Sequence, residues 1–195
     1  YAVVPAISVM KIDRSIPLDR AALVGCGVMT GVGAVTNTAK VRAGSTVVVF
    51  GCGGVGLSAI QGARLVGAKR IIAVDTLDAK LEYARHFGAT DTVNAKDDPV
   101  AAVRELTGGR GADYSFEVTG KVPVMEQAYA ATRRGGTVCI IGIGHYTESF
   151  PLNACGFSAD AKTVIGCMYG NTNFKVDMPD LLELYLSKRL DLDAM

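Results

Sequence analysis

The stretch of residues 45–75, STVVVFGCGGVGLSAIQGARLVGAKRIIAVD, constrains the fold of this chain more than any other. It begins with a continuous apolar run at residues 47–50, which is typical of a strand buried on both faces of a parallel sheet. A glycine-rich turn follows, then a helix expected over residues 54–66 and a second apolar strand at residues 71–74. Asp75 ends that strand. The stretch therefore predicts a β-α-β unit with a carboxylate at its far end.

The turn itself has the spacing G-x-G-x-x-G. In that pattern Gly51 permits the tight turn, Gly53 lets a pyrophosphate approach the backbone, and Gly56 lets the helix pack close to the strand. The free N–H groups at the helix start favour an anion there. Asp75 lies 19 residues after Gly56, where a carboxylate accepts hydrogen bonds from a ribose. Ordinary turn and packing glycines are the alternative, but the agreement of strand, turn, helix and acid favours a dinucleotide site.

Composition and charge limit the other classes of function. The net charge is +1 and no basic cluster is evident along the sequence, so neither nucleic acid nor an anionic membrane is an expected partner. The longest apolar runs look strand-sized, which predicts no transmembrane helix. Five cysteines without a C-x-x-C pair indicate reduced thiols and a cytoplasmic protein. No secretory signal is expected at the start, and the chain opens on Tyr1, as a fragment of a longer protein would.

The rest of the chain alternates between predicted strands and helices. Further strands are expected at residues 90–94, 112–118, 137–142 and 162–169. Helices are expected at residues 20–24, 29–41, 78–87, 99–106, 124–132 and 179–188, with a break at residues 25–27 and an irregular segment at 147–160. This order predicts an α/β fold with a doubly wound, six-stranded parallel sheet of the Rossmann type. Ligands of such sheets bind at the carboxyl ends of the strands, here the turns at residues 51–56, 75–80, 118–121 and 141–146.

Several ordered blocks carry a family resemblance. They are GCGVMTGVGAV at residues 25–35, FGCGGVGLSAI at 50–60, GAKRIIAVD at 67–75, YSFEVTG at 114–120 and GGTVCIIG at 135–142. In order and spacing the chain resembles the zinc-dependent medium-chain alcohol dehydrogenases over nearly its whole length. The most similar members are the long-chain alcohol dehydrogenases and the thiol-linked formaldehyde dehydrogenases. The resemblance implies oxidation of an alcohol to an aldehyde or ketone, with hydride transfer to NAD.

The resemblance also implies roles for individual residues. Cys26 would be one ligand of the catalytic zinc, although a cysteine in this apolar setting could instead be a buried structural residue. Thr30 would be a catalytic residue facing the nicotinamide, and Asp75 and Lys80 would hold the adenosine ribose. The other residues implied in coenzyme binding are Gly51, Gly53, Gly54, Val55, Gly56, Val118, Thr119, Ile141, Gly142 and Ile143.

The implied organisation is a coenzyme domain with flanking pieces of an incomplete catalytic domain. Residues 1–27 would be a remnant of the catalytic domain and a linker, 28–170 the NAD-binding domain, and 171–195 a helix leading back toward the catalytic domain. The remaining zinc ligands are expected upstream, so the isolated chain is expected to be inactive. A homodimer is expected through the edge strand at residues 162–169.

Two other functions stay open from the residues alone. An S-adenosylmethionine-dependent methyltransferase also has a glycine turn after its first strand and an acid after its second. The third glycine of the turn and the pair Gly135-Gly136 favour the dehydrogenase. A non-catalytic nucleotide-binding module is the other alternative. Of the two histidines, His86 is expected at the surface, whereas His145 lies either near the cleft or in solvent.

Overall fold

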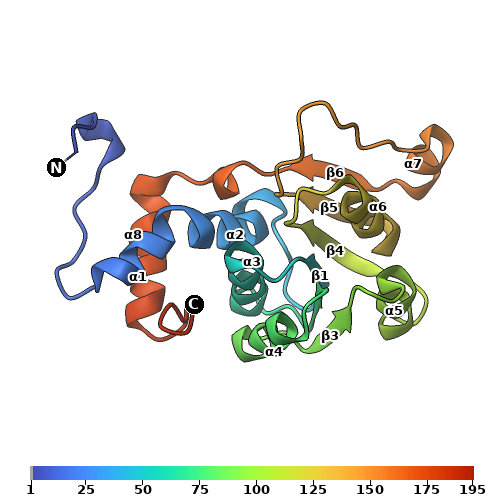
Figure 1. The fold of residues 1–195 in the computed structure, drawn as a ribbon, viewed down its shortest axis with the longest axis horizontal. Coiled ribbons are helices and arrows are strands. Elements are labelled where there is room, and N and C mark those ends of the chain that lie inside the picture. The colour runs from blue at the N-terminus through green and yellow to red at the C-terminus, as the bar shows by residue number, and fades with distance from the viewer. Residues whose placement is uncertain (1) are drawn as a thin grey trace.

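The computed structural model describes residues 2–195, and its centre is a six-stranded sheet in the order β3-β2-β1-β4-β5-β6 (Figure 1). All neighbouring strands run parallel. The strands are β1 (Thr46–Phe50), β2 (Arg70–Asp75), β3 (Asp91–Asn94), β4 (Ala112–Glu117), β5 (Thr132–Ile140) and β6 (Thr163–Gly166). This order reverses at β1, which is the doubly wound arrangement that the sequence predicts.

Helices cover both faces of the sheet. They are α1 (Leu18–Leu23), α2 (Met29–Gly33), α3 (Gly54–Leu65), α4 (Asp78–Phe87), α5 (Pro99–Leu106), α6 (Val122–Ala131), α7 (Ala154–Asp160) and α8 (Phe174–Leu186). Figure 1 shows α3 and α4 on one side and α5 and α6 on the other. Val47 and Val49 belong to the core under α3 and α4, whereas Val48 and Phe50 belong to the core under α5 and α6. Burial on both faces explains why β1 is apolar at every position but Thr46.

The expected helix break at residues 25–27 is wrong. The chain stays helical from α1 through a π-helical segment, η2 (Val24–Val28), into α2, and then through a second one, η3 (Ala34–Thr38). Glycines weaken an isolated helix through backbone entropy. Here tertiary packing compensates, because Val24, Val28 and Val32 are buried in one core with the buried side chains of α8, which are Leu181, Leu182 and Tyr185.

The predicted irregular segment and several element boundaries also differ from the structure. The edge strand expected at residues 162–169 covers only Thr163–Gly166. Residues 154–160 form α7, whose N-cap Asn153 accepts a hydrogen bond from the backbone of Gly156. Helix α8 begins at Phe174 rather than at Pro179, because Asn173 caps it and the proline is tolerated inside. Strand β5 begins five residues early, at Thr132, and its pairing with β4 shifts register between Ala112 and Tyr114.

The helical run Leu18–Thr38 also corrects the expectation that every apolar run is strand-sized. It has 21 residues and a mean hydropathy of 1.3, enough by length and composition to cross a membrane. A core helix meets the same criteria, and 44% of this window is buried inside the protein. The absence of a membrane-spanning segment therefore stays a prediction.

The close packing of α2 on α3 depends on Gly31. A Cβ atom added there would lie 2.3 Å from the carbonyl oxygen of Val55 and 2.5 Å from the Cβ of Ser58. Real Cβ atoms do not approach so closely, so only glycine allows this contact. The contact places the helix that carries Thr30 directly beside the start of α3 and its glycine turn.

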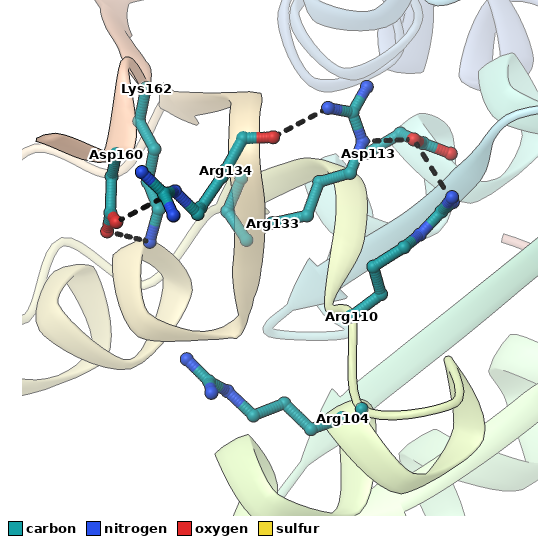
Figure 2. A pocket seen from close by; sticks show the side chains of 9 residues that line it. Arg104, Arg110, Asp113, Arg133, Arg134, Asp160 and Lys162 are labelled. Atoms are coloured by element: carbon teal, nitrogen blue, oxygen red, sulfur yellow. Dashed lines mark hydrogen bonds and ion pairs between the residues drawn. The ribbon is translucent and has the colours of Figure 1, made fainter.

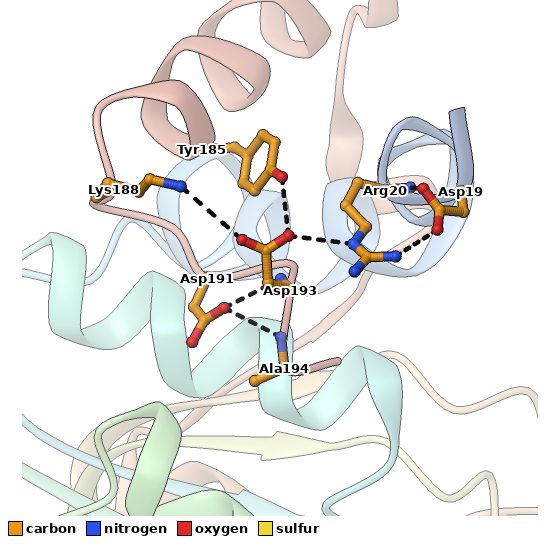
Figure 3. A network of polar contacts seen from close by, with 7 residues as sticks. All are labelled: Asp19, Arg20, Tyr185, Lys188, Asp191, Asp193 and Ala194. Atoms are coloured by element: carbon orange, nitrogen blue, oxygen red, sulfur yellow. Dashed lines mark hydrogen bonds and ion pairs between the residues drawn. The ribbon is translucent and has the colours of Figure 1, made fainter. Parts of the chain in front are cut away.

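A second core joins the N-terminal helices to the C-terminal segment. Arg20 of α1 donates from Nε to Asp193 at 3.1 Å, and the Tyr185 hydroxyl of α8 donates to the same carboxylate oxygen at 2.9 Å (Figure 3). These hydrogen bonds lower the pKa of Asp193. Residues on both sides of the expected boundary at residue 27 share this core. The division into parts 1–27, 28–170 and 171–195 stays a prediction.

Replacing Gly31 by alanine tests the α2–α3 packing. The added methyl group must displace the backbone at Val55, and such overpacking costs about 1–3 kcal/mol. We expect Gly31→Ala to lower the melting temperature by about 3 °C or more. Gly25→Ala is the matched control, because a Cβ atom there meets no atom within 4 Å. Equal melting temperatures of the two variants in calorimetry would contradict this account.

Candidate functional site

A cavity of about 420 Å³ lies at the carboxyl ends of β1, β2 and β4. This is the point where the strand order reverses, and crevices at that point bind ligands in open α/β sheets. Its lining residues are Phe50, Gly51, Gly53, Gly54, Val55, Gly56, Val74, Asp75, Thr76, Lys80, Ala95, Val118, Thr119, Lys121, Val124 and Gln127.

Two glycines of the turn are required by the protein's own geometry. Gly51 has φ of +101°, a conformation that other residues rarely adopt, and its N–H donates to the carbonyl of Val74 at 2.8 Å. A Cβ atom on Gly56 would lie 1.8 Å from the carbonyl oxygen of Gly51. The start of α3 therefore packs directly on the end of β1, as the sequence predicts.

Gly53 and Gly54 are different, because nothing in the protein requires them to be glycines. A Cβ atom on either residue would meet no atom within 4 Å. Gly53 has φ of −81° and ψ of −174°, an extended conformation that any residue adopts. Both residues line the cavity at the N-terminal end of α3, where free N–H groups and the helix dipole favour an anion. The space left by the missing side chains thus fits the pyrophosphate of a dinucleotide.

Asp75 stands at the other side of this turn. Its Oδ2 accepts a hydrogen bond from the Cys52 N–H at 2.8 Å, and its Oδ1 accepts one from the Leu77 N–H at 3.1 Å. The Lys80 ammonium lies 3.9 Å from Oδ2. Two carboxylate oxygens offer about four acceptor positions, so each keeps one for a ribose hydroxyl. Burial and the charge of Asp75 raise the pKa of the Cys52 thiol to about 12, so this thiol stays protonated.

Glu117 is a buried carboxylate whose role the sequence reasoning missed. Its Oε1 accepts hydrogen bonds from the Thr119 N–H at 2.6 Å, from the Thr119 hydroxyl at 2.5 Å and from the Gly120 N–H at 3.0 Å. These bonds fix the turn after β4, which presents Val118 and Thr119 to the cavity. An acidic residue near the end of the strand expected at residues 112–118 was the available signal.

Other predicted residues lie beside the cavity without lining it. A Cβ atom on Gly142 would lie 2.0 Å from the backbone nitrogen of Gly120, so the segment after β5 packs against the turn after β4. Ile141 is buried and Ile143 is 82% exposed. The binding roles of these three residues stay predictions. Thr76 and Lys121, which lie in the predicted turns, also line the cavity. The lining residues outside the predicted turns are Phe50, Val74, Ala95, Val124 and Gln127.

Cys26 and Thr30 lie on the helix that packs against α3. Cys26 is exposed in the π-helical segment, so within residues 2–195 it is not a buried structural cysteine. Within residues 2–195, three or more His, Cys, Asp or Glu side chains do not gather into a group that could hold a metal ion. A catalytic zinc needs about three protein ligands, so these residues alone do not fit one. The role of Cys26 as one ligand and that of Thr30 at the nicotinamide stay predictions.

Neither histidine lies in the cavity lining. His86 is exposed, as expected, and its Nε2 lies 3.0 Å from Asp191. His145 is also exposed and its Nδ1 lies 2.7 Å from the Thr147 hydroxyl, which supports its interpretation as a loop residue in solvent.

Comparison with known proteins supports the dinucleotide interpretation. Residues 54–187 match the family model described as zinc-binding dehydrogenase. The chain is 42% identical to alcohol dehydrogenase 2 of Zea mays, covering 99% of this chain and 52% of the relative, and 42% identical to alcohol dehydrogenase-like 7 of Arabidopsis thaliana, covering 99% and 50%.

Solved structures agree with these relatives. The crystal structure of benzyl alcohol dehydrogenase from Acinetobacter calcoaceticus superimposes with a TM-score of 0.90 at 34% identity, covering 94% of this chain and 51% of that one. An alcohol dehydrogenase from Thermus sp. ATN1 gives a TM-score of 0.85 at 29% identity, covering 94% and 52%. The chain spans about half the length of the curated relatives it matches. With its family model, its relatives and its fold in agreement, the chain belongs to the zinc-binding dehydrogenase family.

Proposed function

We propose that this chain is the coenzyme-binding portion of an NAD-dependent, zinc-type alcohol dehydrogenase. The whole protein would oxidise a small alcohol to an aldehyde or ketone by hydride transfer to NAD. The observation that carries the proposal is the uncrowded pair Gly53-Gly54 over the start of α3, with Asp75 at the far side of the same cavity. Space for the pyrophosphate and an acceptor for the ribose would thus lie in one cavity.

Each part of the coenzyme has a corresponding group in the cavity. The backbone at Gly53 and Gly54 would hold the pyrophosphate, since its N–H groups are free and the helix dipole attracts negative charge. Asp75 would accept hydrogen bonds from the adenosine ribose. Lys80, whose ammonium pairs with the Asp75 carboxylate, would contact the same ribose. The side chains of Val55 and Val118 would cover the apolar part of the coenzyme.

Asp75 favours NAD over NADP. Its side chain is only 9% exposed, and both oxygens already accept backbone hydrogen bonds. A 2′-phosphate would therefore face a fixed negative charge at short range, which costs free energy. NAD supplies the hydride acceptor when it is bound, and the domain's part of the chemistry is to place the nicotinamide ring.

The zinc-bearing half of the reaction would depend on residues outside those described. Cys26 would supply one thiolate to the metal, and a thiolate is a suitable zinc ligand. Thr30 would lie at the nicotinamide end of the coenzyme, because α2 packs against the start of α3. We derive no step through the metal, since residues 2–195 do not assemble a metal site.

We propose a cytoplasmic location, because the sequence has five cysteines and no C-x-x-C pair. The edge strand β6 supports the separate proposal of a homodimer. Among the described residues β6 pairs only with β5, so its other edge keeps free backbone groups. Thr163 and Gly166 are exposed, and Val164 and Ile165 are half-buried. An unpaired edge can pair with a second copy of the same strand.

A methyltransferase or a purely nucleotide-binding module has less support. The relatives and the solved structures named above are alcohol dehydrogenases.

Substitution of Gly53 tests the proposed pyrophosphate position. We expect Gly53→Ala to weaken NADH binding at least about tenfold in a fluorescence titration, because the methyl group would occupy phosphate space. The melting temperature should not change, since the added Cβ atom meets no protein atom within 4 Å. Gly166→Ala in β6 is an equally open control outside the cavity. The position would be wrong if both variants bound NADH as tightly as the unchanged chain.

Substitution of Asp75 tests the coenzyme preference. We expect Asp75→Ser to weaken NADH binding about tenfold and to strengthen NADPH binding, because the repulsion of the 2′-phosphate is removed. The dissociation constants of both coenzymes give the readout. Asp97→Ser removes the same charge at an exposed position outside the cavity and should change neither constant. Unchanged affinities in the Asp75 variant would count against the proposed ribose contact.

Sedimentation of the purified chain tests the dimer. We expect twice the mass of the 20.4 kDa chain at micromolar concentration. A monomeric mass at all concentrations would remove the support for pairing through β6.

A further inference from the structure

A second cavity, of about 570 Å³, lies at the amino ends of the strands. It is opposite the cavity at their carboxyl ends, which we call the coenzyme cavity. The second cavity is bordered by the amino ends of β4 and β5, the segment before β6 and the C-terminal end of α5. Its lining residues are Arg104, Gly109, Arg110, Asp113, Thr132, Arg133, Arg134, Asp160 and Lys162. Five of these side chains are cationic and two are carboxylates, so the lining carries an excess of positive charge (Figure 2).

The first carboxylate is already neutralised. Asp113 accepts a hydrogen bond from Arg133 Nε at 2.5 Å and one from the Thr46 N–H at 2.8 Å, and Arg110 lies 4.0 Å away. Burial raises the pKa of Asp113, but the hydrogen bonds and the arginine charges lower it by more. The net pKa is therefore below its usual value, and the group stays ionised. Asp113 therefore balances only part of the charge of its two arginines.

The second carboxylate, Asp160, is likewise shared between two cations. Asp160 lies 3.3 Å from the Lys162 ammonium and 3.7 Å from Arg134 Nε. Lys162 is only 4% exposed, and its Nζ also donates to the carbonyl of Tyr129 at 2.9 Å. Burial lowers the pKa of Lys162, Asp160 opposes this, and the charge of Arg104 lowers it again. Lys162 and Arg104 thus repel each other across the cavity, and a bound anion would relieve that repulsion.

Arg104 is the side chain with the most unused hydrogen-bonding capacity. Within residues 2–195 its guanidinium makes one hydrogen bond, from Nη2 to the carbonyl of Ala130 at 3.0 Å. A guanidinium has five N–H donors, and Figure 2 shows no contact between Arg104 and the other side chains drawn. The remaining donors are available to a ligand in the cavity.

Capping of helix ends explains only part of this cluster. Arg104 and Lys162 each bond a carbonyl in the last turn of α6, and Arg134 donates to the carbonyl of Ala159 near the end of α7. Such contacts satisfy carbonyls that a helix leaves free. One cation at each helix end would be enough for capping, which requires neither the cavity nor the additional cations Arg110 and Arg133.

We propose that this cavity binds the phosphate group of a small molecule. A doubly charged phosphate oxyanion would accept hydrogen bonds from the free donors of Arg104 and from exposed Arg134, with Lys162 as a nearby buried charge. Arginine is well matched to phosphate, because its planar donors bind two oxygens at once. The site lies outside the coenzyme cavity, so it is independent of the function proposed above.

Titration of the 195-residue chain with inorganic phosphate at constant ionic strength tests this site. We expect saturable shifts of the arginine Nε signals of Arg104 and Arg134 and of the Gly109 amide in heteronuclear NMR spectra. Arg104→Gln should weaken phosphate binding about tenfold. Arg134→Gln provides a second variant at a position whose side chain is 77% exposed and thus tolerant of substitution. Arg85→Gln removes the same charge outside the cavity, from α4, and should leave the affinity unchanged.

A parallel titration with glycerol 3-phosphate distinguishes the source of the phosphate. Equal affinity for both compounds would show that the site recognises the phosphate group alone. Tighter binding of glycerol 3-phosphate would identify a phosphorylated metabolite as the ligand. The proposal is overturned if neither compound gives saturable shifts. It is also overturned if shifts are confined to residues 51–56, or if Arg85→Gln weakens binding as much as Arg104→Gln.

Discussion

The contact between the start of α3 and the end of β1 is the constraint on which the coenzyme cavity depends. Gly56 lies so close to the Gly51 carbonyl that no side chain fits between them. This approach aims the free N–H groups of α3 at the carboxyl end of the sheet. It also brings the N–H of Cys52 within 2.8 Å of the Asp75 carboxylate. The proposed phosphate position and the proposed ribose acceptor are therefore fixed relative to each other by one turn, whose backbone conformation only glycine adopts without strain.

A second close contact extends this rigidity to the helix that carries Thr30 and Cys26. Gly31 brings α2 against the backbone of Val55, next to the glycine turn. Gly33 similarly allows the approach of Gly170, in the segment after β6. In the proposed complex, a group at the nicotinamide end of the coenzyme would have to be positioned to within a fraction of an ångström to serve hydride transfer. Glycines that allow backbone-to-backbone packing would provide that precision without relying on flexible side chains.

The features that the sequence predicts well are those set by local pattern. The glycine turn, Asp75 and the order of six strands follow from apolar runs and turn residues that lie close together in the chain. The continuous helix through residues 25–27 was missed because glycine's intrinsic cost is local, whereas the burial of Val24 and Val28 that offsets it is tertiary. Glu117 escaped assignment for a similar reason, since its hydrogen bonds form only once the turn after β4 is folded.

The basic cavity shows most clearly why a sequence can conceal a site. Arg104, Arg133 and Lys162 are far apart in the chain, so no basic run is visible, and the net charge of +1 suggests an even distribution. A parallel sheet places the amino ends of all its strands at one edge, and the helices that precede those strands end there with free carbonyls. Cations at these positions satisfy the carbonyls, and the topology then gathers them around one cavity. The parallel arrangement that would create a dinucleotide site at the carboxyl ends of the strands thus also concentrates positive charge at their amino ends.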